Sequence, residues 1–344
     1  MRSFLRFFAV FLMFTMIFAG EEDEMSLKRI LDVKSLAKLI SDKTAGIRVL
    51  DCTYAVGPKP DYKQFKEQWY AKFERLMARP TQQKALYLQS HIPGSVHFDI
   101  DAAMYPGEFE RFSMYPPAEF EQYAQLLGIN QSDHLVFYSR GPFGGMMFSS
   151  KAYWLFRSYG HEKLSILDGG FAAWQKEGQE VEKSKDYPQV QKGNWKAKDT
   201  VAQFIMPFEE FNKEGGVLDH PDQYNLLDSR IRAQFDGKQD TGLDPNKVNG
   251  TRIPHTTNIP ASEAVGDDGL LKPLEELKKG LFAPEDPTKP VITYCNTGMQ
   301  ASVISVLQDA LFPDHPARMY NGGLMEMAQR APKRISDGPQ HLVE

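Results

Sequence analysis

The segment Val291-Ile292-Thr293-Tyr294-Cys295-Asn296-Thr297-Gly298 begins as a short apolar run and ends in a turn. A helical pattern with an apolar stripe follows over residues 301–311. Short β-branched runs of this kind suit buried parallel strands. Strands that alternate with helices predict an α/β fold in which helices flank a parallel sheet. Functional sites in such sheets form at the carboxyl ends of strands, and Cys295 stands at such an end.

The first half of the chain repeats this pattern in the same order. The near-constant offset, between 153 and 161 positions in three of the matched blocks, predicts two copies of one domain. We place these copies at residues 26–185 and 200–332. Residues 176–200 carry many charged side chains without an apolar period, which predicts a solvated linker. The matched blocks are Val49–Asp51 with Leu226–Asp228, His91–Gly94 with Arg252–His255, Leu135–Ser139 with Val291–Cys295, and Leu167–Gly170 with Tyr320–Gly323.

Composition excludes several classes of function. The 344 residues carry 40 Lys and Arg against 45 Asp and Glu, and this net charge of −5 argues against binding to nucleic acid or an anionic membrane. Only Cys52 and Cys295 are present, which excludes a disulfide framework and a cysteine zinc site. One disulfide between them stays formally open, although Cys52 lies in a strand-like stretch typical of packing. The histidines show no ligand spacing, so neither a metal nor an organic cofactor is expected.

Residues 1–20 have the pattern of a secretory signal peptide. A basic start precedes an apolar run from Phe7 to Phe18, and Ala19 occupies a plausible cleavage position. The run is short for a membrane span, so an uncleaved anchor is the alternative. Entry into the secretory pathway would make Asn130 and Asn249, each in an Asn-x-Ser/Thr triplet, glycosylation acceptors.

Cys295 is the candidate nucleophile. Amide hydrogens of a tight loop at a helix N-terminus can converge on the sulfur, and Gly298 gives this loop the backbone freedom to curl. Such a setting lowers the pKa of a thiol and makes it nucleophilic. Without further context, this weak signal favours a buried structural cysteine.

The context comes from a combination of motifs. They resemble the tandem-domain rhodanese family of thiosulfate and 3-mercaptopyruvate sulfurtransferases, over roughly residues 27–332. The resemblance implies that Cys295 carries a sulfane sulfur as a persulfide and passes it to a thiol or cyanide. Ser139, at the matching position of the first copy, cannot do so. The family also makes the mitochondrion or cytoplasm alternatives to a secreted location. The motifs are His91–Gly94, Phe98–Asp101, Ser150–Trp154, Leu167–Trp174, Leu227–Arg230 and Thr293–Cys295.

The loop after Cys295 bears on the sulfur donor. Thiosulfate-specific members typically follow the cysteine with basic residues, whereas 3-mercaptopyruvate-specific members have a neutral loop with a hydroxyl. Here the loop is neutral and Thr297 supplies a hydroxyl, which favours 3-mercaptopyruvate. The resemblance assigns proton transfer to Thr297 with His91. His91 could equally order the turn before Pro93, and Thr297 could cap the helix. The loop residues expected to bind substrate are Asn296, Gly298, Met299 and Gln300.

The chain departs from the family where the donor's anionic group is held. Gln234 replaces the first arginine of the family, and a second arginine has no counterpart near Leu243. Charge-assisted pairs are stronger than neutral hydrogen bonds, so this loss weakens anion binding. Arg230 is a candidate replacement, with Gln234 retained in the substrate site.

Two other functions remain open. A weakly active sulfur-carrier or binding protein would fit the missing arginines. A cysteine phosphatase would need an arginine six positions after Cys295, where Ala301 stands.

Overall fold

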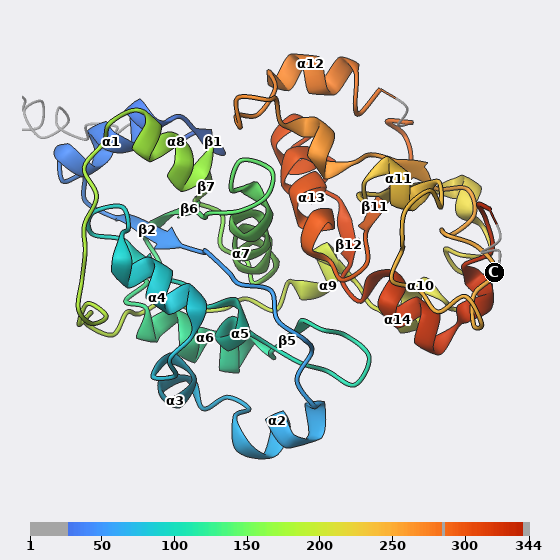
Figure 1. Cartoon of the computed structure of the whole chain (residues 1–344), viewed down its shortest axis with the longest axis horizontal. Coiled ribbons are helices and arrows are strands. Elements are labelled where there is room, and N and C mark those ends of the chain that lie inside the picture. Colours follow the sequence, from blue (N-terminus) through green and yellow to red (C-terminus); the bar gives the residue numbers. More distant parts are fainter. Residues whose placement is uncertain (1–26, 284–285, 340–344) are drawn as a thin grey trace, which may run out of the picture.

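A computed structural model describes residues 27–283 and 286–339, which form two α/β lobes side by side (Figure 1). The predicted leader at residues 1–20 lies outside the described residues. Each lobe contains one five-stranded sheet, and every neighbouring pair within the two sheets is parallel. The predicted α/β class with parallel sheets is therefore confirmed.

The first sheet has the strand order β1-β7-β6-β2-β3. Its helices lie along both faces, and the antiparallel hairpin β4–β5 extends from it (Figure 1). The strands are β1 (Ile30–Leu31), β2 (Ile47–Asp51), β3 (Val96–His97), β4 (Met104–Tyr105), β5 (Ser113–Met114), β6 (His134–Tyr138) and β7 (Leu164–Leu167). The helices are α1 (Val33–Ser41), α2 (Tyr62–Gln68), α3 (Phe73–Met77), α4 (Gln82–Gln89), α5 (Ile100–Ala103), α6 (Pro117–Leu126), α7 (Met146–Ser158) and α8 (Gly170–Lys176).

The second sheet has the order β10-β9-β11-β12-β8, which is the first order read from the opposite edge. The strands are β8 (Ile205–Met206), β9 (Asn225–Asp228), β10 (Thr257–Asn258), β11 (Val291–Tyr294) and β12 (Arg318–Tyr320). The helices are α9 (Val201–Phe204), α10 (Phe208–Phe211), α11 (Arg232–Phe235), α12 (Leu274–Lys279), α13 (Met299–Leu311) and α14 (Gly323–Arg330), with short 3₁₀ turns at Pro221–Gln223, Ala261–Ala264 and Pro332–Arg334. The shared order confirms that the chain contains two copies of one fold.

The weakest sequence match between the copies has a matched backbone. Gly94 has φ +73°, and His255 at the corresponding position has φ +59°. Just before each turn, the chain forms one isolated antiparallel bridge, between His91 and Glu182 in the first copy and between Arg252 and Asp337 in the second. The turn is therefore preserved although its glycine is not.

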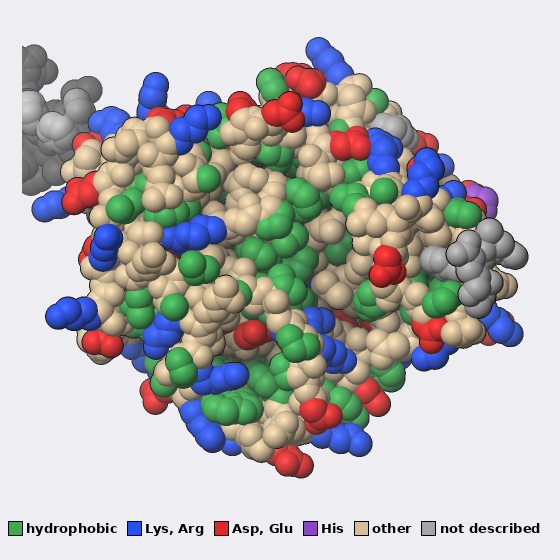
Figure 2. Space-filling view, in the orientation of Figure 1, with side chains coloured by type: hydrophobic (Ala, Val, Ile, Leu, Met, Phe, Trp, Pro, Cys, Tyr) green, Lys and Arg blue, Asp and Glu red, His purple; other side chains and the backbone are tan. Residues whose placement is uncertain are grey.

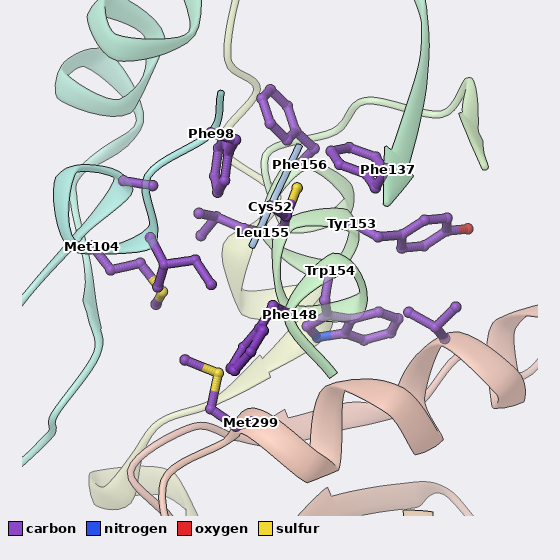
Figure 3. Packing of buried hydrophobic residues seen from close by; sticks show 14 of the residues in the cluster. Cys52, Phe98, Met104, Phe137, Phe148, Tyr153, Trp154, Leu155, Phe156 and Met299 are labelled. Atoms are coloured by element: carbon purple, nitrogen blue, oxygen red, sulfur yellow. The ribbon is translucent and has the colours of Figure 1, made fainter. Parts of the chain in front are cut away.

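Helices α7 and α13 join the two copies. Both begin directly after a left-handed glycine, Gly145 (φ +76°) and Gly298 (φ +74°). Figure 3 shows Met299 of α13 beside Phe148 of α7, with Trp154 facing the same helix. One cluster of buried hydrophobic side chains contains members of both copies. The two domains therefore share a core.

Residues 177–200, between the domains, pack against the first domain. The indole of Trp195 is fully buried and donates a hydrogen bond from Nε1 to Nδ1 of His161 (2.9 Å). Its ring also contacts Phe120 and Phe156. The expectation of a solvated linker is therefore wrong at Trp195, because a single aromatic side chain can anchor a segment that has no apolar period.

Candidate active site

Cys295 directly follows strand β11 at the carboxyl edge of the second sheet, and its side chain is buried. The backbone beneath it is held by the start of α14. The amide of Leu324 donates to the carbonyl of Cys295 (2.9 Å), and the amide of Met325 donates to the carbonyl of Asn296 (3.1 Å). The first turn of α14, which follows the neighbouring strand β12, thus fixes the backbone position of the cysteine.

The loop from Cys295 enters α13 after only three residues. Gly298 supplies the left-handed conformation at the turn, and a 13-residue helix begins at Met299. The N-terminus of such a helix carries a partial positive charge and unpaired amides. The predicted order of strand, loop and helix is therefore present around Cys295, and the effect of this helix end on the thiol stays a prediction.

A lysine from the first domain reaches this loop. Lys151 lies on α7, and its buried ammonium donates to the carbonyl of Gly298 (3.3 Å) and to Oδ1 of Asn321 (2.5 Å). Burial lowers the pKa of Lys151 to about 8, although the nearby charges of Cys295 and Glu110 act to raise it. This residue belongs to the Ser150–Trp154 motif, but nothing in the sequence predicted a role for it. The available signal was a lone charged side chain within residues 146–156, which form most of α7.

The predicted substrate residues of the loop lie together around the turn. Asn296 donates weakly from Nδ2 to the carbonyl of Thr241 (3.4 Å), and Thr297 is partly exposed. Within the described part of the chain, Oδ1 of Asn296 and Oε1 of Gln300 are buried without a hydrogen-bond partner. Met299 packs into the shared core. Two polar acceptors and a hydroxyl therefore remain available next to the cysteine.

Arg230 is fully buried at the end of β9. Its guanidinium makes a bidentate ion pair with Asp228 and donates from Nη2 to the carbonyl of Thr251 (2.8 Å). Burial lowers the pKa of Arg230, but the ion pair and hydrogen bonds with Asp228, together with nearby Tyr294 and Cys295, raise it overall. Nη1 alone has no partner among the described residues. The ion pair and the bond to Thr251 engage most of the donors of this guanidinium. The role of Arg230 toward substrate stays a prediction.

Gln234, the residue in place of a family arginine, donates from Nε2 to the carbonyl of Asp240 (3.0 Å). This hydrogen bond stabilises the loop that follows α11. The role of Gln234 toward substrate also stays a prediction.

His91 makes its contacts within the first domain. Its ring stacks on Tyr87 at 4.0 Å, Nδ1 is 2.8 Å from the carbonyl of Tyr87, and Nε2 is 3.8 Å from a carboxylate oxygen of Glu182. These contacts order the turn before Pro93, and they do not bring the ring to Thr297. The proton-transfer role of His91 stays a prediction.

Ser139 lies at the position equivalent to Cys295, directly after β6, whereas Cys52 directly follows β2. The Ser139 hydroxyl donates to the carbonyl of Gly145 (2.5 Å), so it is committed to its own loop. The Cys52 side chain is fully buried, and burial raises the pKa of the Cys52 thiol well above the ordinary value. Neither residue is placed to act as a nucleophile.

Fold and site together define a two-domain α/β protein with one cysteine at a strand end of its second domain. The family model described as "Rhodanese-like domain" matches residues 32–177 and 215–330. The chain belongs to the rhodanese family.

Relatives cover almost the whole chain. A Caenorhabditis elegans protein with a provisional name as a thiosulfate sulfurtransferase is 46% identical over 331 residues, covering 92% of this chain and 99% of the relative. A thiosulfate sulfurtransferase of Gallus gallus is 29% identical, covering 87% and 90%. The solved structure of SseA from Escherichia coli, described under 3-mercaptopyruvate sulfotransferases, is 26% identical with a TM-score of 0.66, covering 86% and 99%.

The described residues contain no group of three or more His, Cys, Asp or Glu side chains that could hold a metal ion. In the same ranges, no helix has the length and apolar character needed to cross a membrane.

Proposed function

We propose that this protein is a sulfurtransferase that carries a sulfane sulfur as a persulfide on Cys295. The observation that carries the proposal is the position of Cys295, between a buried strand and a helix N-terminus in the second of two rhodanese domains. Ser139 at the equivalent position makes the first domain non-catalytic. The names of the relatives agree with this activity.

The reaction has two steps. With thiosulfate, the Cys295 thiolate attacks the outer sulfur, a new S–S bond forms, and sulfite leaves with the electron pair of the broken S–S bond. With 3-mercaptopyruvate, the C–S bond breaks instead, and the donor's thiol proton moves to the methylene carbon to give pyruvate. Cyanide or a thiolate then attacks the outer sulfur of the persulfide and restores the Cys295 thiolate.

We favour 3-mercaptopyruvate as the donor because the loop Asn296–Gln300 carries no charge. Only this donor needs an internal proton transfer, and the partly exposed hydroxyl of Thr297 lies in the loop that would serve it. Relatives at similar identity are named for either donor, with a mouse 3-mercaptopyruvate sulfurtransferase at 28%. A panel of both donors under identical conditions measures the preference, and a higher kcat/KM with thiosulfate would contradict it.

The cysteine assignment is tested by incubating the protein with each donor and measuring mass added to the Cys295 peptide. We expect one sulfur atom on wild type and on Cys52→Ser, and none on Cys295→Ser. Cys52→Ser is the matched control because both thiols are buried. Persulfide on Cys52, or turnover retained in Cys295→Ser, would refute the assignment.

The same experiment separates the enzyme from a sulfur carrier. The missing family arginines motivate the carrier alternative, since Gln234 is neutral and bound to its own loop. A persulfide that forms on Cys295 but is not discharged by cyanide or by small thiols would favour the carrier. Steady-state turnover with either acceptor would exclude it.

We further propose that residues 1–20 direct the chain into the secretory pathway. The support is the charge and hydropathy pattern of this segment. Asn249, one of the two glycosylation candidates, is exposed. N-terminal sequencing of the natural protein is the test, and an intact Met1 or a mitochondrial cleavage site would contradict the proposal.

A further inference from the structure

We propose that Lys151, contributed by the first domain, is a positioning residue of the active site that fixes the loop after Cys295 and stabilises the anionic sulfur. The inference deepens the proposed function and rests on it. It gives the non-catalytic domain a direct part in the chemistry, and it supplies the local cation that the neutral loop lacks.

The first line of argument is contact geometry. Lys151 Nζ donates to the carbonyl of Gly298, which is the last residue of the loop before α13. The approach is so close that a Cβ on Gly298 would lie 3.1 Å from Nζ and 2.8 Å from Asn321 Oδ1. Lys151 thus reaches from α7 to this carbonyl and holds in place the turn that positions Cys295.

The second line concerns what Lys151 is paired with. A buried ammonium is costly unless it is paired and hydrogen-bonded, and in this chain the buried Arg230 has the carboxylate of Asp228 in contact. The hydrogen-bond partners of Lys151 are instead a backbone carbonyl and the neutral amide of Asn321. The first copy has Asp168 where the second has Asn321. The positive charge is therefore left uncompensated by its direct partners.

The third line follows the amide of Asn321 away from the lysine. Its Nδ2 donates to the carbonyl of Phe112 (2.6 Å) and to Oε1 of Glu110 (3.2 Å), both in the segment between β4 and β5. These bonds orient the amide so that its oxygen faces Lys151. A series of hydrogen bonds from the first domain through Asn321 to Lys151 thus holds the ammonium in place.

The charged groups around Lys151 determine what its charge can do. Cys295 from the end of β11 and Glu110 from the hairpin both interact with it and favour its protonated form. Arg230 from the end of β9 also interacts with Cys295. Between α7 and α13, the carboxylate of Asp309 pairs with Arg29 and Arg157 and accepts a hydrogen bond from Tyr153. Cys295 is therefore the anion whose formation Lys151 can favour from within the catalytic loop region.

The test is the pH profile of Cys295 alkylation by iodoacetamide in the full-length chain, read by mass spectrometry of the Cys295 peptide. We expect Lys151→Met to raise the midpoint by about one pH unit or more, since a nearby opposite charge shifts a titration by about that amount. The alkylation rate at pH 7 should fall about tenfold. Lys151→Arg should restore most of the rate, and Lys176→Met, which removes an exposed lysine, should leave the profile unchanged.

Asn321→Asp is the second variant, because it neutralises the lysine with little change in shape. We expect it to raise the midpoint in the same direction, so the inference stays testable even if Lys151→Met does not fold. A midpoint unmoved in folded Asn321→Asp, or in folded Lys151→Met, would overturn the inference.

Alkylation needs no sulfur donor, and this keeps the two claims separate. A wild type that forms no persulfide would refute the proposed function, while a shifted alkylation profile would still support the effect of Lys151 on the thiol. A persulfide that forms normally together with an unshifted profile would refute Lys151 alone.

Discussion

Gly323 has φ +60° and lies directly beneath the catalytic loop. A Cβ there would be 2.3 Å from the carbonyl oxygen of Cys295, closer than any real contact. Gly215 has a similar φ of +65° but open space around it. Gly215→Ala should therefore cost only the conformational penalty of about 1–2 kcal/mol. Gly323→Ala should add a steric cost of about 1–3 kcal/mol and displace the cysteine.

Urea denaturation and steady-state assays of both variants measure this difference. We expect Gly323→Ala to lose most activity and Gly215→Ala to keep it. Equal losses of stability in the two variants would mean that the loop accommodates the methyl group of Gly323→Ala without a steric cost in free energy.

The depressed pKa of Lys151 predicts how stability depends on pH. The folded-state value is about 8, against 10.5 for the free side chain, and burial is the cause. Between these values the unfolded chain binds more protons than the folded one, so stability rises with pH. Below pH 8 both states are protonated, and the full penalty of about 3 kcal/mol applies. The free energy of unfolding of wild type minus that of Lys151→Met should thus increase from pH 8 to 10.

Chemical denaturation at pH 7, 8, 9 and 10 gives this difference directly. Activity should move in the opposite direction above pH 8, because the neutral amine no longer favours an anionic sulfur. A difference in stability that is constant from pH 7 to 10 would show that the folded protein leaves the pKa of Lys151 at its ordinary value, and it would contradict the effect of burial.

Single residues differ in how far sequence alone could place them. Cys295 was predictable because a strand end precedes a glycine turn, and Ser139 because the repeat aligns it with Cys295. Lys151 was not predictable, since its partners Gly298 and Asn321 are brought to it by the packing of one domain on the other. Sequence spacing carries no information about such a contact.

At the scale of elements, α7 and α13 meet around one buried carboxylate. Asp309 on α13 is fully buried and pairs with Arg29 (2.8 Å) and Arg157 (3.5 Å), while Tyr153 on α7 donates a hydrogen bond to it (2.9 Å). Removing one partner of a buried pair leaves the others unpaired, so Asp309→Ala should destabilise the protein by about 3–5 kcal/mol.

The control is Asp42→Ala, because the Lys38–Asp42 pair on α1 is exposed, so its loss should leave stability nearly unchanged. Thermal unfolding of both variants is the measurement. A loss in Asp309→Ala as small as that in Asp42→Ala would show that water replaces the carboxylate.

The starts of these helices were harder to predict than their existence. The apolar stripe predicted a helix from residue 301, whereas α13 begins at Met299. The equivalent helix of the first domain, α7, begins at Met146. In both cases the start is set by a left-handed glycine, Gly298 or Gly145, and not by the apolar period. Hydrophobic periodicity indicates which face of a helix is buried but does not indicate where its first turn begins.

At the scale of the molecule, the domains exchange short segments across their interface. The segment between β4 and β5 extends from the first domain to α14, where Arg330 stacks on Phe109. In return, residues 265–271 reach the first domain, where the amide of Leu271 donates to Asp168 (2.8 Å). A Cβ on Gly169 would lie 2.6 Å from the Leu270 side chain. The second domain thus covers strand ends of the first, while the first extends Lys151 to the loop after Cys295.

This exchange surrounds a hollow between the lobes where hydrophobic side chains gather (Figure 2). The repeat predicted two copies of one fold and is confirmed, but equivalence of sequence blocks cannot give the orientation of one copy on the other. The pairing of α7 with α13 and the shared core depend on that orientation. For this reason the sequence predicts Cys295 as the candidate nucleophile but gives no sign of the contact between Lys151 and Gly298.

The shared core predicts that the two domains unfold in one cooperative transition. All four tryptophans, Trp69, Trp154, Trp174 and Trp195, precede residue 200, so tryptophan fluorescence reports on the first domain and its linker. In a Cys52→Ser background, the reaction of Cys295 with a thiol reagent reports on the second domain. If α7 and α13 unfold together, the two probes should give the same urea midpoint and slope. Exposure of Cys295 at a lower urea concentration than the fluorescence change would mean that the second domain unfolds by itself, and that the contact of Lys151 with Gly298 is lost before the first domain unfolds.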